Sequence, residues 1–497
     1  MRTFLLAALL SLSLLPAAEK NPPAKDPQNP PPLPAKVSKE ASVTIDGQKI
    51  SYEVTAATLI LKKDDGSPRA SIFHTSYIRK DLPDGQKSHE RPVIFAFNGG
   101  PGSSSVWLHL GALGPRIVPT SADGTQPLAP PHQVVENPQS ILDLADLVFI
   151  DPVSTGYSRP EKDGKKSDFH GVREDISSIA DFIRRWTSEN ERWASPKFLL
   201  GESYGGIRAA GLASHLQERY GMNLNGVVLL SSLLDFRTLR AGSGDDLPHS
   251  VFLPVFTATA HHHGKIKGDR DQLYREAEAY AFGPYASLLL KGSRLSAEER
   301  QQAASKLAAL TGLPAQLWAD NKLRLSPSRF RTELLRAEKK VLGRFDARAA
   351  WPNHSPRSDY PDHDPSYAVV HGAFSTAMLD YLTRELGWQD HKTYEILTGE
   401  VHPWNWGRGN EITNLSDELA EALRDNPRLR ILVMGGYTDL ATPPSGIHHS
   451  LDHLLDLPPA ARRQITSTWY EAGHMFYLNE PDLKKMRQDL KSFLQAE

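Results

Sequence analysis

The strongest constraint on the fold is a short segment in which an apolar run ends in Gly-x-Ser-x-Gly and leads into a helical pattern. The run covers residues 197–200, and the serine is Ser203. A serine on a sharp turn between a strand and a helix tolerates only small neighbours, which Gly201 and Gly205 supply. The segment therefore predicts that Ser203 is a nucleophile and that the N–H of Tyr204 points at a developing oxyanion.

Further apolar runs indicate the architecture. They are too continuous for strands with one solvated face, so they predict parallel strands that are buried on both faces. The runs are residues 93–97, 147–150, 198–200, 227–230 and 431–434. Amphipathic stretches at 172–186 and 207–220 suit crossover helices between them. The sequence thus predicts an α/β fold with a mostly parallel central sheet.

Two other regions depart from this alternation. Before it, the segments 43–45, 50–54, 57–61 and 70–78 are separated by turn residues and predict an N-terminal antiparallel lead-in of hairpins. Within it, residues 236–382 are rich in helix formers without a convincing strand, and parallel strands are usually joined by far less chain. We therefore expect an inserted helical cap at about 236–382.

The N-terminus predicts export. Residues 1–18 carry one positive charge, a short apolar run and small residues, which is typical of a signal peptide; a signal anchor is the alternative. Residues 19–38 form a Pro-rich linker, and residues 39–497 form the folded domain. The chain has no cysteine, so its stability cannot depend on disulfides. These features favour a secreted or periplasmic protein without a spanning segment in its mature form.

The charge composition excludes one class of partner. The 57 lysine and arginine residues nearly balance 59 aspartate and glutamate residues, so no overall field attracts a polyanion. Nucleic acid is therefore not expected as a partner, and any substrate must be selected locally.

Candidates for the remaining catalytic groups follow two of the expected strands. Asp439 lies just after the run 431–434, and His474 follows a predicted strand at 466–470. Active sites of open α/β sheets lie at the carboxyl ends of strands, and the order Ser, Asp, His is the one such a sheet requires. In this frame His474 is the general base and acid, and Asp439 fixes its tautomer.

Five blocks in this order resemble the signature segments of the serine carboxypeptidase family. They are residues 98–104, 151–158, 201–206, 435–439 and 473–475. The resemblance runs from about residue 93 to the C-terminus and is that of a bacterial-type secreted member. It implies an α/β-hydrolase fold with a helical cap, and removal of C-terminal residues from peptides through an acyl-enzyme. It implies no cofactor and no metal, with a peptide that has a free C-terminus as the partner; the oligomeric state stays open.

The resemblance also implies roles for the residues beside Ser203. Gly100 resembles the second oxyanion donor, while Asn98, Gly99 and Glu202 resemble groups that bind the substrate and its terminal carboxylate. A carboxylate repels another carboxylate, so Glu202 must be protonated to donate, and burial would favour that form. The alternatives are a turn residue at Asn98 and a structural partner of the serine turn at Glu202.

Two positions depart from the family pattern. Phe97 replaces the tryptophan that usually precedes the Asn-Gly-Gly block, and Ala112 replaces a glutamate of the carboxylate-binding network. These changes keep open an esterase or acyltransferase that uses the same Ser203. A binding protein with a relic site is a third reading, which the complete Ser, Asp and His set argues against.

Two further clusters, one of histidines and one of tryptophans, lie outside these blocks. Residues 261–263 are three consecutive histidines, but adjacent side chains diverge on a helix, so surface or cleft-lining histidines are favoured over a metal site. Trp404 and Trp406 lie ahead of the Asp439 strand and either line the substrate cleft or pack the cap.

Overall fold

The computed structural model describes residues 35–496 except 163, 408, 410 and 411. The predicted signal peptide (1–18) and most of the predicted linker (19–38) lie outside these residues. The first strand begins at Lys36 and pairs with the next strand from its first residue, so the end of the predicted linker was wrong. Residues 36–38 belong to the sheet because their backbone groups are hydrogen-bonded in its ladder.

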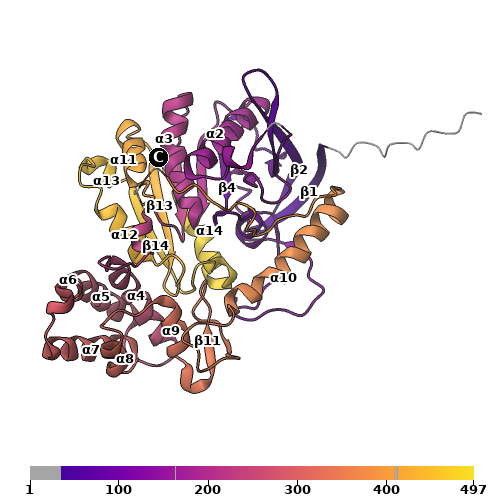
Figure 1. The fold of residues 1–497 in the computed structure, drawn as a ribbon. Helices are drawn as coiled ribbons and strands as arrows, with labels where there is room; N and C mark the ends of the chain where they lie inside the picture. Colours follow the sequence, from indigo (N-terminus) through magenta and orange to yellow (C-terminus); the bar gives the residue numbers. More distant parts are fainter. Residues whose placement is uncertain (1–34, 163, 408, 410–411, 497) are drawn as a thin grey trace, which may run out of the picture.

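One large mixed sheet organises the molecule (Figure 1). Its strands are, in spatial order, β1 (Lys36–Ile45), β2 (Gln48–Lys62), β3 (Pro68–Arg79), β7 (Asp146–Ile150), β4 (Val93–Phe97), β9 (Lys197–Glu202), β10 (Gly226–Leu230), β13 (Arg430–Gly436) and β14 (Ile465–Tyr470), and β8 (Arg159–Pro160) pairs with β3. All pairs from β7 to β14 are parallel, and those from β1 to β7 are antiparallel. The predicted fold class, a mostly parallel sheet with an antiparallel lead-in, is confirmed. The lead-in has three strands rather than four segments, because β2 continues unbroken through Thr55 and Ala56.

The central strands are buried on both faces, as their continuous apolar sequences require. In β4, Val93, Phe95 and Phe97 face one hydrophobic cluster, while Ile94 and Ala96 face the other. The first cluster is covered by α2 (Val172–Glu189), α3 (Tyr204–Tyr220), α11 (Ser416–Asp425), α12 (Pro444–Asp452) and α13 (Pro459–Arg462). The second is covered by α1 (Val106–Leu108), α10 (Pro365–Asp380) and α14 (Glu480–Gln495).

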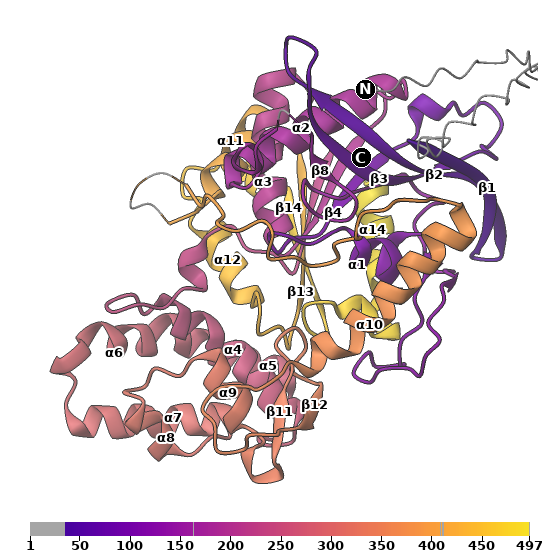
Figure 2. The ribbon, with the colours of Figure 1, turned by 45° about the vertical axis from the view of Figure 1, so that its right-hand side comes forward.

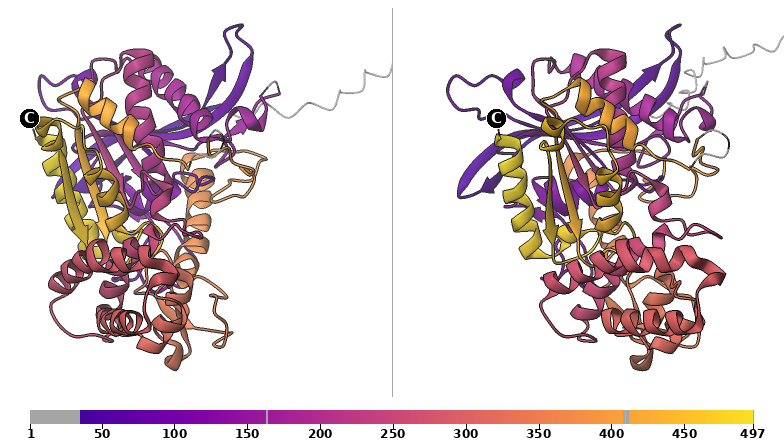
Figure 3. Two further views of the ribbon diagram at one scale, coloured as in Figure 1. Left: turned by 60° about the vertical axis from the view of Figure 1, so that its left-hand side comes forward. Right: turned by 90° about the vertical axis from the view of Figure 1, so that its left-hand side faces the viewer.

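A helical cap lies beyond one end of the sheet (Figures 1 and 3). It contains α4 (Leu247–His262), α5 (Arg270–Tyr280), α6 (Ala286–Lys291), α7 (Ala297–Thr311), α8 (Ala315–Asp320) and α9 (Pro327–Glu333). These helices share their own hydrophobic cluster, in which the rings of Phe256 and Phe330 stack with centroids 4.0 Å apart. Leu440, which follows β13, belongs to this cluster and joins the cap to the carboxyl end of the sheet.

The interval 236–382 is less uniform than the sequence predicts. It contains a hairpin of β11 (Lys340–Leu342) and β12 (Ala350–Pro352). The sequence did not predict this hairpin, because strands of three residues are too short to give an alternating pattern. The interval also contains α10, which packs alongside α1 on the sheet rather than within the cap (Figure 2).

Outside this interval, the short strands β5 (Arg116–Ile117) and β6 (Val135–Glu136) form a second small antiparallel pair. Within the described ranges, no helix is both long and apolar enough to span a bilayer.

A buried ionic cluster holds the amino end of the parallel strands. Asp146 is fully buried and contacts Arg91 Nε at 3.1 Å and Arg192 Nη1 at 2.7 Å. The remaining donors of the two guanidinium groups are hydrogen-bonded mostly to backbone carbonyls, including those of Leu142 and Arg91. A buried charge cluster of this kind tolerates no missing partner, because an unpaired charge cannot regain its hydration.

We therefore predict that Asp146→Ala lowers the free energy of unfolding by about 3–5 kcal/mol, because two buried guanidinium groups lose their carboxylate. Urea denaturation followed by circular dichroism measures the change. Asp81→Ala is the matched control: this carboxylate pairs with Arg79 at the surface and is 36% exposed, so its loss should cost about 0–1 kcal/mol. Equal losses for the two variants would contradict the assigned role of Asp146.

Candidate active site

Ser203 occupies a strained turn between β9 and α3. Its backbone has φ 62° and ψ −127°, a conformation that a residue with a side chain adopts at a cost of about 1–3 kcal/mol. The turn is tight enough that a Cβ on Gly201 would lie 2.2 Å from the carbonyl oxygen of Gly205. The strain and the close approach together hold the Ser203 side chain above the carboxyl end of β9, as the sequence predicts.

The loop after β4 packs directly against this turn. A Cβ on Gly99 would lie 2.5 Å from the backbone nitrogen of Tyr204, so only glycine permits the approach. The next residue, Gly100, lines the same cavity as Ser203. Among the described residues, no acceptor is hydrogen-bonded to the backbone N–H of Gly100 or Tyr204. Both donors are therefore available beside the Ser203 hydroxyl.

His474 and Asp439 form a buried pair on the loops after β14 and β13. The Nδ1–H of His474 donates to Asp439 Oδ2 at 2.8 Å. Asp439 Oδ1 accepts hydrogen bonds from the backbone N–H groups of Ala441 and Thr442, at 2.7 and 3.0 Å. This arrangement fixes the carboxylate and the imidazole tautomer, and it leaves Nε2 of His474 to face the cavity.

The imidazole is poised to hold a proton. Burial opposes its charge, but attraction and hydrogen bonding from Asp439, together with Glu202, outweigh burial and raise the pKa of His474 above its ordinary value. His474 and Ser203 line one cavity, although the Ser203 hydroxyl is hydrogen-bonded to none of the described residues. Bonds between nucleophile and base are often long without substrate, so the missing bond does not exclude Ser203 and His474 as such a pair.

Glu202 is a buried carboxyl group beside the imidazole. Its Oε1 lies 4.0 Å from His474 Nε2, and Tyr477 donates its O–H to Oε2 at 2.8 Å. Burial raises the pKa of Glu202 to about 7, against the lowering effects of His474, Tyr477 and Asn98. A carboxyl group with this pKa is partly protonated near neutral pH and can then donate a hydrogen bond.

Asn98 serves two purposes at the end of β4. Its Oδ1 accepts from the N–H of Leu108 at 3.1 Å, which joins the end of β4 to α1. Its buried Nδ2 has no hydrogen-bond partner among the described residues, although it lies close enough to lower the pKa of Glu202. A buried amide donor without a partner is costly, so it points to a ligand group in the cavity.

These residues meet in a cavity of about 330 Å³. Its polar wall comes from Asn98, Gly99, Gly100, Glu202, Ser203 and His474, and its apolar wall includes Trp107, Phe345, Tyr367, Val370 and Met475. The combination of one polar edge and an apolar wall is typical of a site that orients a small or extended organic substrate.

Sequence reasoning missed several residues around this site, of which Tyr477, Arg344 and Phe345 bear most directly on its chemistry. Tyr477 lies only three residues after His474 and could have been noticed as a possible neighbour. It packs so closely that a Cβ on Gly111 would lie 2.9 Å from its Cε2, and Ala112 is buried next to Gly111. The partner of Glu202 in this chain is therefore the phenol of Tyr477, and Ala112 stands where the family pattern has a glutamate. Arg344 and Phe345 enter from the segment before β12, and no sequence signal connects them to the site.

Other sequence candidates lie elsewhere. Phe97 does not line the cavity but packs below the serine turn, with Arg208 5.1 Å above its ring. Trp404 and Trp406 do not line the cavity; both lie against Tyr204, in the hydrophobic cluster on one face of the sheet. The prediction that they line the cleft was wrong, whereas Trp406 packs on Phe236 and Arg240, at the start of the predicted insertion and outside the helices α4 to α9.

The three consecutive histidines, residues 261–263, do not converge on one point. His261 and His263 each contact a backbone carbonyl, of Gly268 at 3.0 Å and of Ala347 at 2.7 Å, and burial lowers the pKa of His262 to about 4. Elsewhere in the described chain, His354, Asp362 and His363 place ligand atoms within 4.8 Å of one another, but His363 is already hydrogen-bonded to Asp362. Neither group reaches the cavity that contains Ser203.

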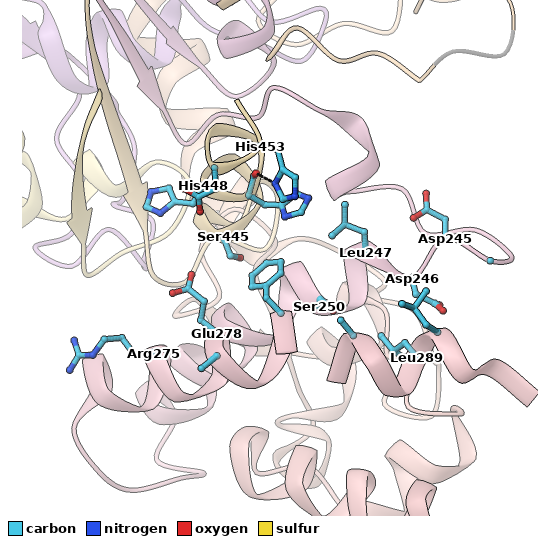
Figure 4. A pocket seen from close by; sticks show the side chains of 17 residues that line it. Asp245, Asp246, Leu247, Ser250, Arg275, Glu278, Leu289, Ser445, His448 and His453 are labelled. Carbon is cyan, nitrogen blue, oxygen red and sulfur yellow. Dashed lines mark hydrogen bonds between the residues drawn. The ribbon is translucent and has the colours of Figure 1, made fainter. Parts of the chain in front are cut away.

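A larger cavity of about 860 Å³ lies between α12 and the cap helices (Figure 4). Glu278, His448 and His453 are among its lining residues, as Figure 4 shows. It contains none of Ser203, Asp439 and His474, so the smaller cavity is the one with catalytic chemistry.

Comparisons with known proteins agree with the geometry. A profile of the serine carboxypeptidase family matches residues 77–475. A pheromone-processing carboxypeptidase of Yarrowia lipolytica is 31% identical over 153 residues, which cover 30% of this chain and 23% of that protein. A carboxypeptidase Y homolog A of Pyricularia oryzae is 25% identical over 226 residues, covering 40% and 37%. The chain therefore spans well under half the length of these relatives.

Among solved structures, a proline iminopeptidase of Mycobacterium smegmatis is 14% identical and covers 88% of this chain and 97% of its own, with a TM-score of 0.36. The fold is therefore assigned from the order and direction of the strands and not from this likeness.

We predict that Tyr477→Phe raises the pKa of Glu202 further above about 7, because the hydrogen bond that favours the ionised carboxylate is lost while burial remains. Infrared titration of the carboxyl group, taken as the difference from a Glu202→Gln protein, measures this pKa. Tyr470→Phe is the control, since Tyr470 donates to Asp489 instead. An unchanged pKa in Tyr477→Phe would show that the phenol does not stabilise the carboxylate.

Proposed function

This chain belongs to the serine carboxypeptidase family, and from that premise we propose that it removes C-terminal residues from peptides through a Ser203 acyl-enzyme. The observation that supports the proposal best is a single cavity lined by Ser203, the buried Glu202 and His474, whose imidazole is hydrogen-bonded to Asp439 behind it. A nucleophile, an oriented base and a carboxyl group able to meet a carboxylate are what this reaction requires.

In the proposed reaction, the Ser203 hydroxyl attacks the carbonyl carbon of the last peptide bond. His474 Nε2 takes the hydroxyl proton, and Asp439 stabilises the imidazolium that forms. The N–H groups of Gly100 and Tyr204 donate to the tetrahedral oxygen. The proton on Nε2 then passes to the leaving amine, which departs as the freed C-terminal residue. Water repeats the sequence on the acyl-enzyme, with His474 again as base.

Terminal-carboxylate binding is assigned to Asn98 and Glu202. The unpartnered Nδ2 of Asn98 is a donor for the substrate carboxylate. Protonated Glu202 is a second donor, whereas ionised Glu202 would repel the substrate. Ala112 removes one glutamate of the family pattern, but Glu202 itself remains. Tyr477 donates a hydrogen bond to Glu202 and is its partner in this chain.

We also propose that the protein acts outside the cytoplasm, as a secreted or periplasmic enzyme. This proposal rests on the signal-like sequence of residues 1–18 and on the absence of cysteine, and on no feature of the folded domain.

The nucleophile is tested first. A fluorophosphonate should label the protein at Ser203, and Ser203→Ala should lose the label and lower kcat on a blocked dipeptide by more than about 10³-fold. Mass spectrometry of the labelled peptide and single-turnover kinetics measure both. Ser293→Ala, at an exposed serine in the cap, should behave like the wild type. Turnover retained by Ser203→Ala would exclude the proposed acyl-enzyme.

The pH dependence tests recognition of the carboxylate. Below about pH 7 Glu202 is protonated and donates, so kcat/KM for a peptide with a free C-terminus should fall as pH rises through the pKa of Glu202. A matched ester without a carboxylate should lack this fall and should only gain activity as His474 becomes neutral. The difference should arise mainly in KM, because binding rather than chemistry is lost.

Glu202→Gln is the informative variant, since it keeps a donor without the charge. It should extend peptide hydrolysis to higher pH. It should also move the rise in activity to lower pH for both substrates, because ionised Glu202 helps to raise the pKa of His474. Identical profiles for peptide and ester, unchanged in Glu202→Gln, would exclude this mode of recognition and favour an esterase.

A further inference from the structure

One charged side chain of the active-site cavity has no role in the reaction described above. Arg344 lines the cavity together with Ser203 and His474, and it is exposed. Among the other ionisable groups that line the cavity, His474 pairs with Asp439 and Glu202 is buried against Tyr477, while His402 and Tyr367 have no assigned role. Within the described part of the chain, no carboxylate forms an ion pair with the Arg344 guanidinium.

The structure holds this guanidinium beside the catalytic histidine. It lies 5.2 Å from the ring centroid of Phe345, and the Phe345 ring stacks on the imidazole of His474 with centroids 5.1 Å apart. The guanidinium is therefore no further from the imidazole than these two distances combined. Its positive charge is close enough to oppose protonation of His474. A flexible side chain anchored on an aromatic face loses less conformational freedom when it binds a ligand.

Asp364, which is hydrogen-bonded to the backbone of Arg344, already has other partners. Asp364 Oδ1 accepts from the backbone N–H of Arg344 at 3.0 Å and from the Ser366 hydroxyl at 2.6 Å, and Arg331 lies 3.7 Å away. The charge of the Arg344 side chain thus faces the mouth of the cavity without a partner. A guanidinium that lines a substrate cleft without an ion-pair partner favours a ligand carboxylate.

We propose that Arg344 selects substrates with an acidic side chain next to the cleaved bond. The proposal rests on the peptidase activity proposed above and adds a preference to it. The terminal carboxylate is the other possible ligand, but Asn98 and Glu202 are 1% and 3% exposed, whereas Arg344 is at the exposed mouth. A peptide has one terminal carboxylate, so a second carboxylate at the mouth must come from a side chain. Arg344 and Ser203 line one cavity, so a side chain on a residue next to the cleaved bond can extend toward Arg344.

The test compares blocked tripeptides that differ only in glutamate or glutamine on either side of the cleaved bond. We expect the wild type to cleave the glutamate peptide about fivefold more efficiently, by kcat/KM, at low salt, with the ratio falling toward one at 0.5 M salt. Arg344→Gln should abolish the ratio, and Arg344→Lys should keep part of it. Arg294→Gln removes the same charge at an exposed position in the cap and should keep the full ratio.

The outcomes separate the possible failures. Equal glutamate-to-glutamine ratios in the wild type and Arg344→Gln would overturn the proposal. A uniform loss in Arg344→Gln for all free C-terminal peptides, but not for their amides or esters, would assign Arg344 to the terminal carboxylate instead. If the wild type cleaves no peptide, the proposed function fails. Binding of the same peptides to Ser203→Ala, measured by calorimetry, then still decides whether Arg344 distinguishes glutamate from glutamine.

Discussion

The close approach of two backbones at the carboxyl edge of the sheet is the constraint on which the site depends. The loop after β4 reaches the turn after β9 only because Gly99 leaves no side chain against Tyr204. This contact brings the N–H groups of Gly100 and Tyr204 to the side of Ser203. Any larger residue at Gly99 would separate the two loops, and the donors and the nucleophile would no longer meet.

A second constraint is electrostatic. Glu202, His474 and Asp439 are all nearly inaccessible, and the imidazole of His474 holds a proton more readily because both carboxyl groups lie near it. Asp439 receives hydrogen bonds from backbone N–H groups and stays available to the imidazole, while Tyr477 supports the ionised form of Glu202. Burial penalises the ionised carboxylate of Glu202 by more than the imidazole of His474 and the phenol of Tyr477 favour it, and the pKa of Glu202 therefore rises.

The cap contributes chemistry as well as cover. Its own hydrophobic cluster allows it to fold as a unit on the end of the sheet, joined to it through Leu440. The segment before β12 then places Phe345 on His474 and Arg344 at the mouth of the cavity. An inserted segment can therefore change which substrates enter without altering the strands that hold the catalytic groups.

The sequence by itself determined the central strands, the antiparallel lead-in and the positions of Ser203, Asp439 and His474, because hydrophobic periodicity and strand-end residues are local signals. It pointed to Glu202 and Asn98 through the resemblance of their segments to the blocks of the serine carboxypeptidase family. Only the tertiary structure decided that Tyr477 contacts Glu202, that Arg344 and Phe345 enter the cavity, and that Trp404 packs away from it. These contacts join residues up to about 275 positions apart, and no local pattern encodes which distant side chains share a cavity.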